Sequence, residues 1–145
     1  MGRAGYDAGV EIQYLLVCDY AEIVNGKLYL MGGGWDRYDA REVPTNFRLA
    51  VAAGVRIGWE ETNVLNPVRI IIEDDDGKEL ARIDGTMQVG RPANLPPGST
   101  QLSQIAANLP LRAEAFGGYR VRMVAGDGER SVEATVPFRV YEKSG

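Results

Sequence analysis

The sequence contains no histidine, and its 145 residues include one cysteine, Cys18. Without histidine, the chain can build neither a Ser-His-Asp or Cys-His catalytic arrangement nor a histidine metal site. A single cysteine allows no internal disulfide, no cysteine-based zinc site and no self-contained iron–sulfur cluster. The sequence therefore excludes the commonest forms of nucleophilic catalysis and of metal binding by histidine or cysteine.

Lysine and long apolar runs are also scarce. The chain has three lysines beside thirteen arginines, and acidic residues outnumber both together to give a formal net charge of −4. It therefore lacks the basic surface that nucleic-acid binding usually needs. No run approaches the ~18 apolar residues of a membrane-spanning helix. Asp7 interrupts the first ten residues before any apolar core of signal-peptide type can form. We therefore expect a cytoplasmic protein that binds neither nucleic acid nor membrane.

The pattern that dominates the sequence is an alternation of apolar and polar residues with a period of two, which is typical of half-buried strands. Residues 47–59 carry apolar side chains at every odd position, with small or charged ones between them. Residues 10–20 carry apolar side chains at every even position, in the order Val10, Ile12, Tyr14, Leu16, Cys18 and Tyr20. This alternation places Cys18 on the buried face of a strand, where we expect an inert core residue.

Turn signals separate the alternating segments. Asn25-Gly26 predicts a type I′ hairpin, because that turn needs a positive φ at both central residues. The run Gly32-Gly33-Gly34 predicts a sharp bend rather than a continued strand. Residues 74–77 and 126–129 are rich in aspartate and glycine and predict two further hairpin loops. The segments between these turns are therefore expected to pair as antiparallel hairpins.

The remaining segments give weaker signals. A strand over residues 101–109 is expected to break at Pro110, and only residues 60–66 and 111–116 could hold a single helical turn. The whole pattern predicts an all-β fold, a single antiparallel β-sandwich of about eight strands. We expect this domain to span residues 9–141, with flexible ends at residues 1–8 and 142–145.

Three stretches of the chain carry a resemblance to known sequences. The first runs from Leu16 through Asn25-Gly26 to Arg37, and the others are Gly117-Gly118-Tyr119 and the final Pro137 to Val140. In these stretches the chain resembles an uncharacterised bacterial all-β family of unknown function. The resemblance implies a sandwich of immunoglobulin-like or C2-like character. It brings no activity, ligand or catalytic residue to any position of this sequence.

Two glycine- or acid-rich stretches are candidates for ion binding. Asp74-Asp75-Asp76-Gly77 could hold calcium with Asp127 and Glu129 of another loop, but it fails the EF-hand pattern because isoleucines stand at positions 1 and 12. Aspartates that bond their own backbone in a turn explain this stretch more simply. The glycines at 32–34 lack the Lys-Ser/Thr pair and the helix that a phosphate-binding loop needs. We expect no metal and no cofactor.

Carboxylate pairs and cross-strand charges give little support for catalysis. Glu60-Glu61 and Glu73 with Asp84 are the local carboxylate pairs, and nothing places either across a pocket. We therefore expect no enzyme. A four-residue loop in the last hairpin would set Arg122 opposite Glu133 and Arg120 opposite Thr135, and a similar pairing would set Arg69 opposite Arg82.

The segment after the glycine run is the candidate partner-binding surface. It presents Trp35, Arg37, Tyr38 and Arg41, residue types that are common at the energetic centres of protein interfaces. In the other interpretation, Trp35 fills one end of the core and Arg37 pairs with a neighbouring acid. The sequence favours a non-catalytic binding module that contacts a protein partner or a second copy of itself. The alternatives are a structural subunit of a phage particle or filament, and a carboxylate-dependent enzyme or calcium-responsive module.

Overall fold

The computed structural model describes residues 9–144, and these residues form nine strands and two 3₁₀ helices but no α-helix. The 3₁₀ helices span Trp59–Glu61 and Gly128–Arg130. The strands are β1 (Val10–Val24), β2 (Lys27–Gly33), β3 (Arg37–Ala40), β4 (Thr45–Ile57), β5 (Asn66–Asp74), β6 (Glu79–Met87), β7 (Gln101–Ala113), β8 (Gly117–Ala125) and β9 (Val132–Glu142). The prediction of an all-β fold is confirmed.

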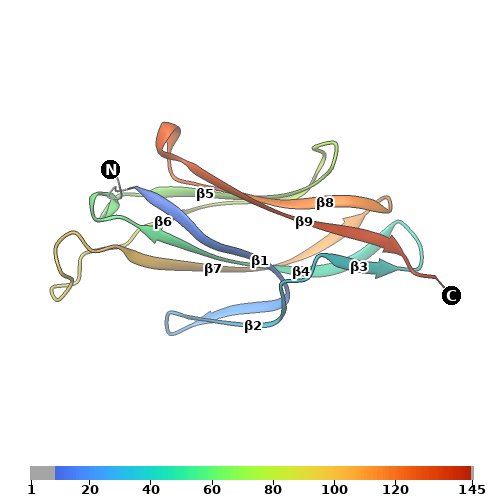
Figure 1. Cartoon of the computed structure of the whole chain (residues 1–145), viewed down its shortest axis with the longest axis horizontal. Helices are drawn as coiled ribbons and strands as arrows, with labels where there is room; N and C mark the ends of the chain where they lie inside the picture. Colours follow the sequence, from blue (N-terminus) through green and yellow to red (C-terminus); the bar gives the residue numbers. More distant parts are fainter. Residues whose placement is uncertain (1–8, 145) are drawn as a thin grey trace.

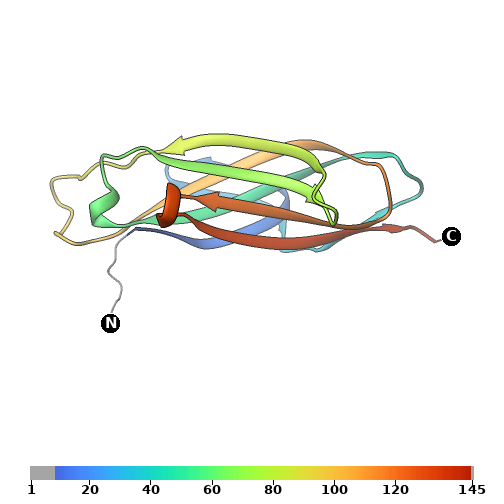
Figure 2. The same ribbon diagram turned by 90° about the horizontal axis from the view of Figure 1, so that it is seen from above.

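The strands form two sheets that pack face to face (Figures 1 and 2). The first sheet has four antiparallel strands in the order β2-β1-β4-β7, and the second has five in the order β3-β9-β8-β5-β6. The second sheet is mixed, because β3 pairs with β9 in parallel. The expectation of a wholly antiparallel sandwich was therefore wrong for this pair. The bend at Gly32-Gly33-Gly34 carries the chain from one sheet to the other, and β3 then joins the edge of β9.

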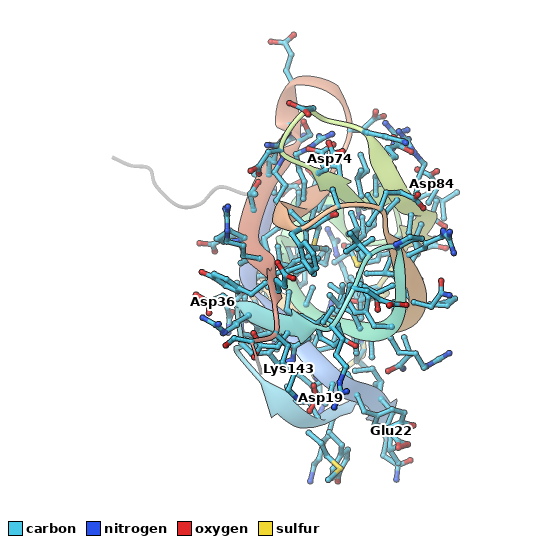
Figure 3. All side chains as sticks on the ribbon, turned by 90° about the vertical axis from the view of Figure 1, so that its right-hand side faces the viewer. Asp19, Glu22, Asp36, Asp74, Asp84 and Lys143 are labelled. Atoms are coloured by element: carbon cyan, nitrogen blue, oxygen red, sulfur yellow. The ribbon has the colours of Figure 1, made fainter. Side chains whose placement is uncertain are left out.

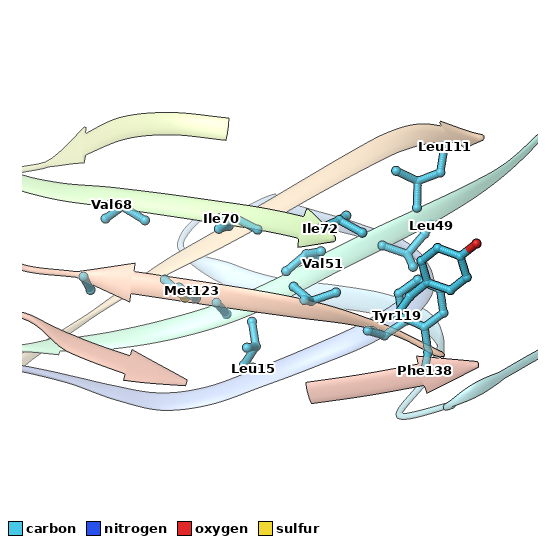
Figure 4. Packing of buried hydrophobic residues seen from close by; sticks show 14 of the residues in the cluster. Leu15, Leu49, Val51, Val68, Ile70, Ile72, Leu111, Tyr119, Met123 and Phe138 are labelled. Carbon is cyan, nitrogen blue, oxygen red and sulfur yellow. The ribbon is translucent and has the colours of Figure 1, made fainter. Parts of the chain in front are cut away.

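The core lies between the sheets and comes from alternate residues of the central strands (Figure 4). Leu49 and Val51 of β4 face Ile70 and Ile72 of β5, with Met123 of β8 beside them. At one end, Phe138 of β9 stacks on Tyr119, with ring centroids 5.5 Å apart. The apolar odd positions predicted for β4 are thus the positions that fill the core.

The burial of β1 departs from the predicted alternation. A β-bulge between Ile12 and Tyr14 adds a residue relative to β4 and reverses the faces of the strand beyond it. Leu15 and Val17 therefore point into the core, whereas Cys18 is buried on the opposite face of the sheet. The expectation that every even position through residue 20 faces one core was wrong, and Tyr20 is exposed.

Strand β7 continues through the proline that was expected to end it. Pro110 lies opposite Arg48, and pairing with β4 extends to Ala113. An edge strand tolerates proline where its missing N–H would have pointed away from the sheet. Residues 111–113 are accordingly strand rather than a helical turn, whereas the turn expected within residues 60–66 begins one residue earlier, in the 3₁₀ helix Trp59–Glu61.

The cross-strand partners of the arginines also differ from the predicted ones. Arg122 lies opposite Thr135 and Arg120 opposite Pro137, because the loop before β9 has six residues rather than four. Arg69 lies opposite Asp84, and its Nε is 2.8 Å from the carboxylate. A register shift after Ile72 changes that pairing, so no two arginines face each other there.

The two ends of the chain differ in what the structure describes. Residues 1–8, which we expected to be flexible, lie outside the described residues. At the other end β9 runs to Glu142, and the backbone N–H of Lys143 donates to the carbonyl of Ala40 at 2.7 Å. The domain limits of 9–141 remain a prediction. Across residues 9–144, no helix has the length and apolar character needed to cross a membrane.

Candidate functional site

The second half of β1 and all of β2 form a hairpin that projects from the sandwich (Figure 1). β1 pairs with β4 only as far as Cys18, and from there it pairs with β2 alone. Asn25 and Gly26 connect the two strands with φ values of 50° and 76°. Both signs are positive, as a type I′ turn requires, so the predicted hairpin is confirmed.

The inner face of this hairpin packs on the outer face of the first sheet. Leu28 and Leu30 of β2 contact a small apolar cluster that includes Cys18, Ala21, Ala50, Ala52 and Ala106. The alanines of β4 leave room for the leucines, because a larger side chain at either position would hold the hairpin away. The hairpin therefore adds a partial third layer over β4 and β7.

Side chains of β7 fasten the hairpin backbone to this layer. The Asn108 side-chain amide donates to the carbonyl of Ala21 at 2.8 Å and accepts from the N–H of the same residue at 3.2 Å. The Gln104 amide donates to the carbonyl of Gly26 at 2.8 Å, and the Tyr14 hydroxyl donates to Gln104. These bonds hold β1 and the turn of the hairpin in one position.

The outer face of the hairpin carries an unusual number of exposed apolar side chains. Met31 is 70% exposed, Tyr29 53% and Tyr20 46%, and Val24 lies on the same face. We call these four residues the hairpin surface. The same hairpin supplies five of the nine large apolar side chains that are exposed among the described residues. Exposed apolar side chains gathered in this way typically mark an interaction site.

Charged groups are few on this surface. Glu22 lies between the apolar residues and accepts a hydrogen bond from the Tyr20 hydroxyl at 3.1 Å. This bond and the charge of the carboxylate raise the pKa of Tyr20. Lys27 is the only basic residue of residues 19–31. Figure 3 shows Asp19 and Glu22 at the lower end of the molecule, on the projecting hairpin.

Cys18 lies beneath the hairpin and has no exposed surface. Burial raises the pKa of its thiol, and the negative charge of Asp19 raises it further. A raised pKa leaves little of the thiolate that reacts with electrophiles. Cys18 is therefore buried as predicted, although the cluster around it is the small one outside the main core.

The structure does not bring the four predicted partner-binding residues onto one surface. The Trp35 ring meets Phe138 edge to face at 6.1 Å, and the Tyr38 ring stacks on Phe47 at 4.4 Å. Both rings thus pack against the core. Arg37 and Arg41 are exposed, and they differ from the two aromatic residues in this respect. A partner-binding role for these residues remains a prediction.

Arg37 is fixed by contacts within the chain. Its Nε is 3.0 Å from an oxygen of Asp39, so it pairs with a neighbouring acid. Its guanidinium carbon lies 3.8 Å from the centre of the Tyr141 ring. This cation–π contact covers one face of Tyr141, which is itself only partly exposed.

Several of the candidate metal and carboxylate residues have partners within the chain. One oxygen of Asp74 accepts the N–H groups of Asp76 and Lys78, both at 2.9 Å, as a turn-forming aspartate does. Glu61 lies 3.0 Å from Arg130, and Glu73 faces Glu79 rather than Asp84 in the strand register. Within residues 9–144, no group of three or more histidine, cysteine, aspartate or glutamate side chains is placed to hold a metal ion.

The hairpin surface was missed by the sequence interpretation, although a signal was present. Tyr29 and Met31 occupy alternate positions in a strand whose other alternate positions, Leu28 and Leu30, are also apolar. A strand that is apolar on both faces needs cover on both faces. The described structure covers only the face that carries the leucines.

Comparison with known proteins identifies the family but no activity. The chain matches none of the curated proteins. A family model described as a family of unknown function (DUF6941) matches residues 13–141, which include most of the two sheets and the whole hairpin. The resemblance to an uncharacterised all-β family is thereby confirmed, and the chain belongs to this family of unknown function, DUF6941.

Proposed function

We propose that this protein is a non-catalytic binding module that acts through protein–protein contacts, and that the hairpin surface is its contact site. The observation that carries the proposal is the exposure of Tyr20, Tyr29 and Met31 on one face of a fixed hairpin. When a partner removes exposed apolar side chains from water, binding is stabilised by about 25 cal/mol for each Å² of apolar surface that is buried.

The rigidity of the hairpin supports this role. A surface that is already ordered loses little conformational entropy when it binds. Asn108 bonds the backbone of β1, Gln104 bonds the turn at Gly26, and Leu28 and Leu30 of β2 anchor the inner face. Tyrosine and methionine are also enriched in protein interfaces. The hairpin therefore resembles a prepared contact site more than a surface loop.

The proposal includes the narrower assignments that the sequence suggested. These are an immunoglobulin-like or C2-like sandwich, a bacterial source and a cytoplasmic location. A structural subunit of a larger assembly, such as a phage particle or filament, is the second candidate. It is favoured by the free edge of β2, which ends the first sheet and could pair with a further strand.

Affinity capture from the native host tests the proposal. The full chain and its Tyr29→Glu variant are immobilised, and Leu65→Glu serves as the matched control. Leu65 is 62% exposed, but it lies in the loop before β5, outside the hairpin. We expect Tyr29→Glu to reduce recovery of the bound protein at least about tenfold, since a charge enters the apolar contact, while Leu65→Glu has no effect. Equal recovery by all three chains would contradict the proposal.

A further inference from the structure

We propose that the partner of the hairpin is a second copy of this chain, joined to the first by antiparallel pairing of the two β2 strands. In this arrangement Leu28 of each copy pairs with Leu30 of the other. The inference rests on the proposed function, because it names the partner that the hairpin surface would bind. It begins from the backbone groups at the free edge of β2.

The free edge of β2 offers a short row of unpaired backbone groups. Lys27, Tyr29 and Met31 lie opposite Val24, Glu22 and Tyr20 across a two-residue turn, and such a turn makes these the hydrogen-bonded pairs of the hairpin. The N–H and C=O groups of Leu28 and Leu30 therefore point away from β1. Among the described residues, no backbone partner is found for them beyond the hairpin.

Three antiparallel registers could bring these groups together, and the structure favours one. Pairing Leu28 with itself would place Leu30 opposite Gly26, whose carbonyl already accepts a bond from Gln104. Pairing Leu30 with itself would place Leu28 opposite Gly32, where the backbone turns away with a φ of 61° and the Asp19 carboxylate lies close. Pairing Leu28 with Leu30 uses the four groups of each copy and needs no others.

The side chains of the outer face suit this register. Tyr29 meets Tyr29 of the second copy across the two-fold axis, and Met31 meets Lys27 on either side. Directly opposite aromatic and apolar side chains stabilise neighbouring strands. The exposed apolar side chains of the two hairpin surfaces would then form one continuous four-stranded face.

The charges suit it as well. Within the described residues, Lys27 forms no ion pair. In the paired hairpins, Lys27 of one copy lies in a row with Met31 and Tyr20 of the second copy. The Tyr20 hydroxyl of that second copy donates to its own Glu22. The one cation of each hairpin is thus directed toward the acid of the other, while the two lysines stay apart.

The length of the edge argues for a second copy rather than a longer strand. Between the engaged Gly26 carbonyl and the turn at Gly32, only Leu28 and Leu30 direct backbone groups to the free edge. A longer strand from another protein would find no further free groups on β2, whereas a second β2 matches it in length and in pattern. Two-fold pairing also closes the edge of each copy, and two-fold dimers are the commonest closed assemblies of identical chains.

Sedimentation equilibrium of the full chain tests the proposal through the register. We expect the mass to rise with concentration from 15.8 kDa toward twice that value. Met31→Lys places like charges opposite each other twice in the dimer and should raise its Kd about tenfold or more. The double variant Lys27→Glu, Met31→Lys makes both pairs attractive and should restore association, while Leu65→Lys should leave it unchanged. The proposal would be overturned if Met31→Lys left the Kd of the dimer unchanged, or if the double variant failed to restore association.

A cysteine at the symmetry axis gives a second readout. Directly opposite residues in such a pair have Cα atoms about 4.5 Å apart, within the range for a disulfide. Tyr29→Cys should therefore form a cross-linked dimer on mild oxidation, and Lys27→Cys should not. A chain that stays at 15.8 kDa and forms no cross-link overturns the second-copy proposal. In that case, if immobilised Leu65→Glu captures another protein from the host and immobilised Tyr29→Glu does not, the proposed function stands without the dimer. If no hairpin variant changes either the captured protein or the association of the chain, the proposed function and the dimer are both wrong.

Discussion

At the scale of single residues, the most constrained charge is Glu73 on the outer face of the second sheet. Its side chain is buried beneath two arginines, and it accepts bonds from Arg120 and from Arg122, the latter at 3.4 Å. These bonds, with that from Arg120 the larger cause, lower the pKa of Glu73. The carboxylate therefore stays charged in the folded protein at a pH where it would take up a proton in the unfolded chain.

This difference predicts a pH dependence of stability. Because the pKa of Glu73 is lower in the folded state, its stabilisation is complete above the unfolded value of about 4.3. It is lost as the pH falls through the folded value. Glu73→Gln should cost about 1–3 kcal/mol at neutral pH, since Arg120 loses its anion and Arg122 keeps only Glu133, 3.8 Å away. It should also flatten the acid limb of the stability curve. Urea titrations from pH 3 to pH 7 measure both effects.

The control for this prediction is Glu129→Gln, which removes an exposed carboxylate from the 3₁₀ helix Gly128–Arg130. It should leave the free energy of unfolding and its acid limb unchanged. If Glu73→Gln and Glu129→Gln give the same curve, the arginines do not depend on Glu73 for their placement.

Two glycines inside strands predict opposite outcomes for the same substitution. A Cβ atom on Gly54 would overlap the ring of Tyr14, whereas one on Gly85 would meet no atom within 4 Å. Gly54→Ala should therefore cost about 1–3 kcal/mol, the usual cost of overpacking. Gly85→Ala should be neutral or slightly stabilising, because alanine restricts the unfolded chain more than glycine does. Thermal unfolding of the two variants measures the difference, and equal melting temperatures would contradict the placement of Tyr14.

At the scale of elements, the hairpin of residues 19–31 is held on the first sheet by side-chain contacts rather than by pairing with β4. Asn108 supplies two hydrogen bonds to Ala21, and Cys18 lies buried below. Asn108→Ala should release the hairpin locally while the two sheets stay folded. Labelling of Cys18 by a thiol reagent should then be slow in the wild-type chain and much faster in the variant, since local opening exposes the thiol.

Hydrogen exchange separates this local opening from global unfolding. The amides of residues 19–31 should exchange faster in Asn108→Ala, and those of β5 and β8 should not. Asn46→Ala, on the neighbouring strand β4, is the matched control. Rapid labelling of Cys18 in the wild-type chain without denaturant would show that the hairpin does not protect it.

The elements could be predicted from the sequence more readily than their registers. The alternation in β4 and the Asn25-Gly26 turn depend on neighbouring residues, so local patterns sufficed. The bulge after Ile12 and the register shift after Ile72 depend on partner strands. The bulge reversed the faces of β1, and the register shift placed Arg69 opposite Asp84. Residues near a bend can lie on either side of it. For this reason the sequence grouped Trp35 with Arg37, whereas the fold separates core from surface at that point.

The candidate site was harder to predict because the exposure of its residues depends on how the hairpin packs on the outer face of the first sheet. Tyr29 and Leu28 are neighbours with similar apolar character, and only the packing of the hairpin on Ala50 and Ala52 decides which of the two is covered. That packing requires both the reversed face of β1 and the small side chains of β4. Neither is visible in the sequence of the hairpin itself.

At the scale of the whole molecule, the two tryptophans lie near opposite ends of the sandwich. The backbone N–H of Arg139 donates to the carbonyl of Asp36, which ties the Trp35 segment to the last strand. Trp59 begins the 3₁₀ helix after β4, where the guanidinium carbon of Arg91 lies 4.0 Å from its ring centre. Figure 1 shows this short helix at the left end and β3 at the right. Each tryptophan therefore reports on one end of the molecule.

If both sheets and their shared core form one cooperative unit, the two ends must unfold together. Trp59→Phe leaves Trp35 as the only tryptophan, and Trp35→Phe leaves Trp59. In each variant, the urea transition followed by fluorescence should coincide with the transition followed by circular dichroism of the strands, as two-state unfolding requires. The comparison is made within each variant, so a loss of stability from the substitution itself does not affect it. We expect coincidence in both, because β4 and β5, which flank Trp59, supply the centre of the core that β9 closes at the Trp35 end. A fluorescence transition that precedes the dichroism in one variant only would show that this end opens by itself, and the domain would then contain two cooperative parts.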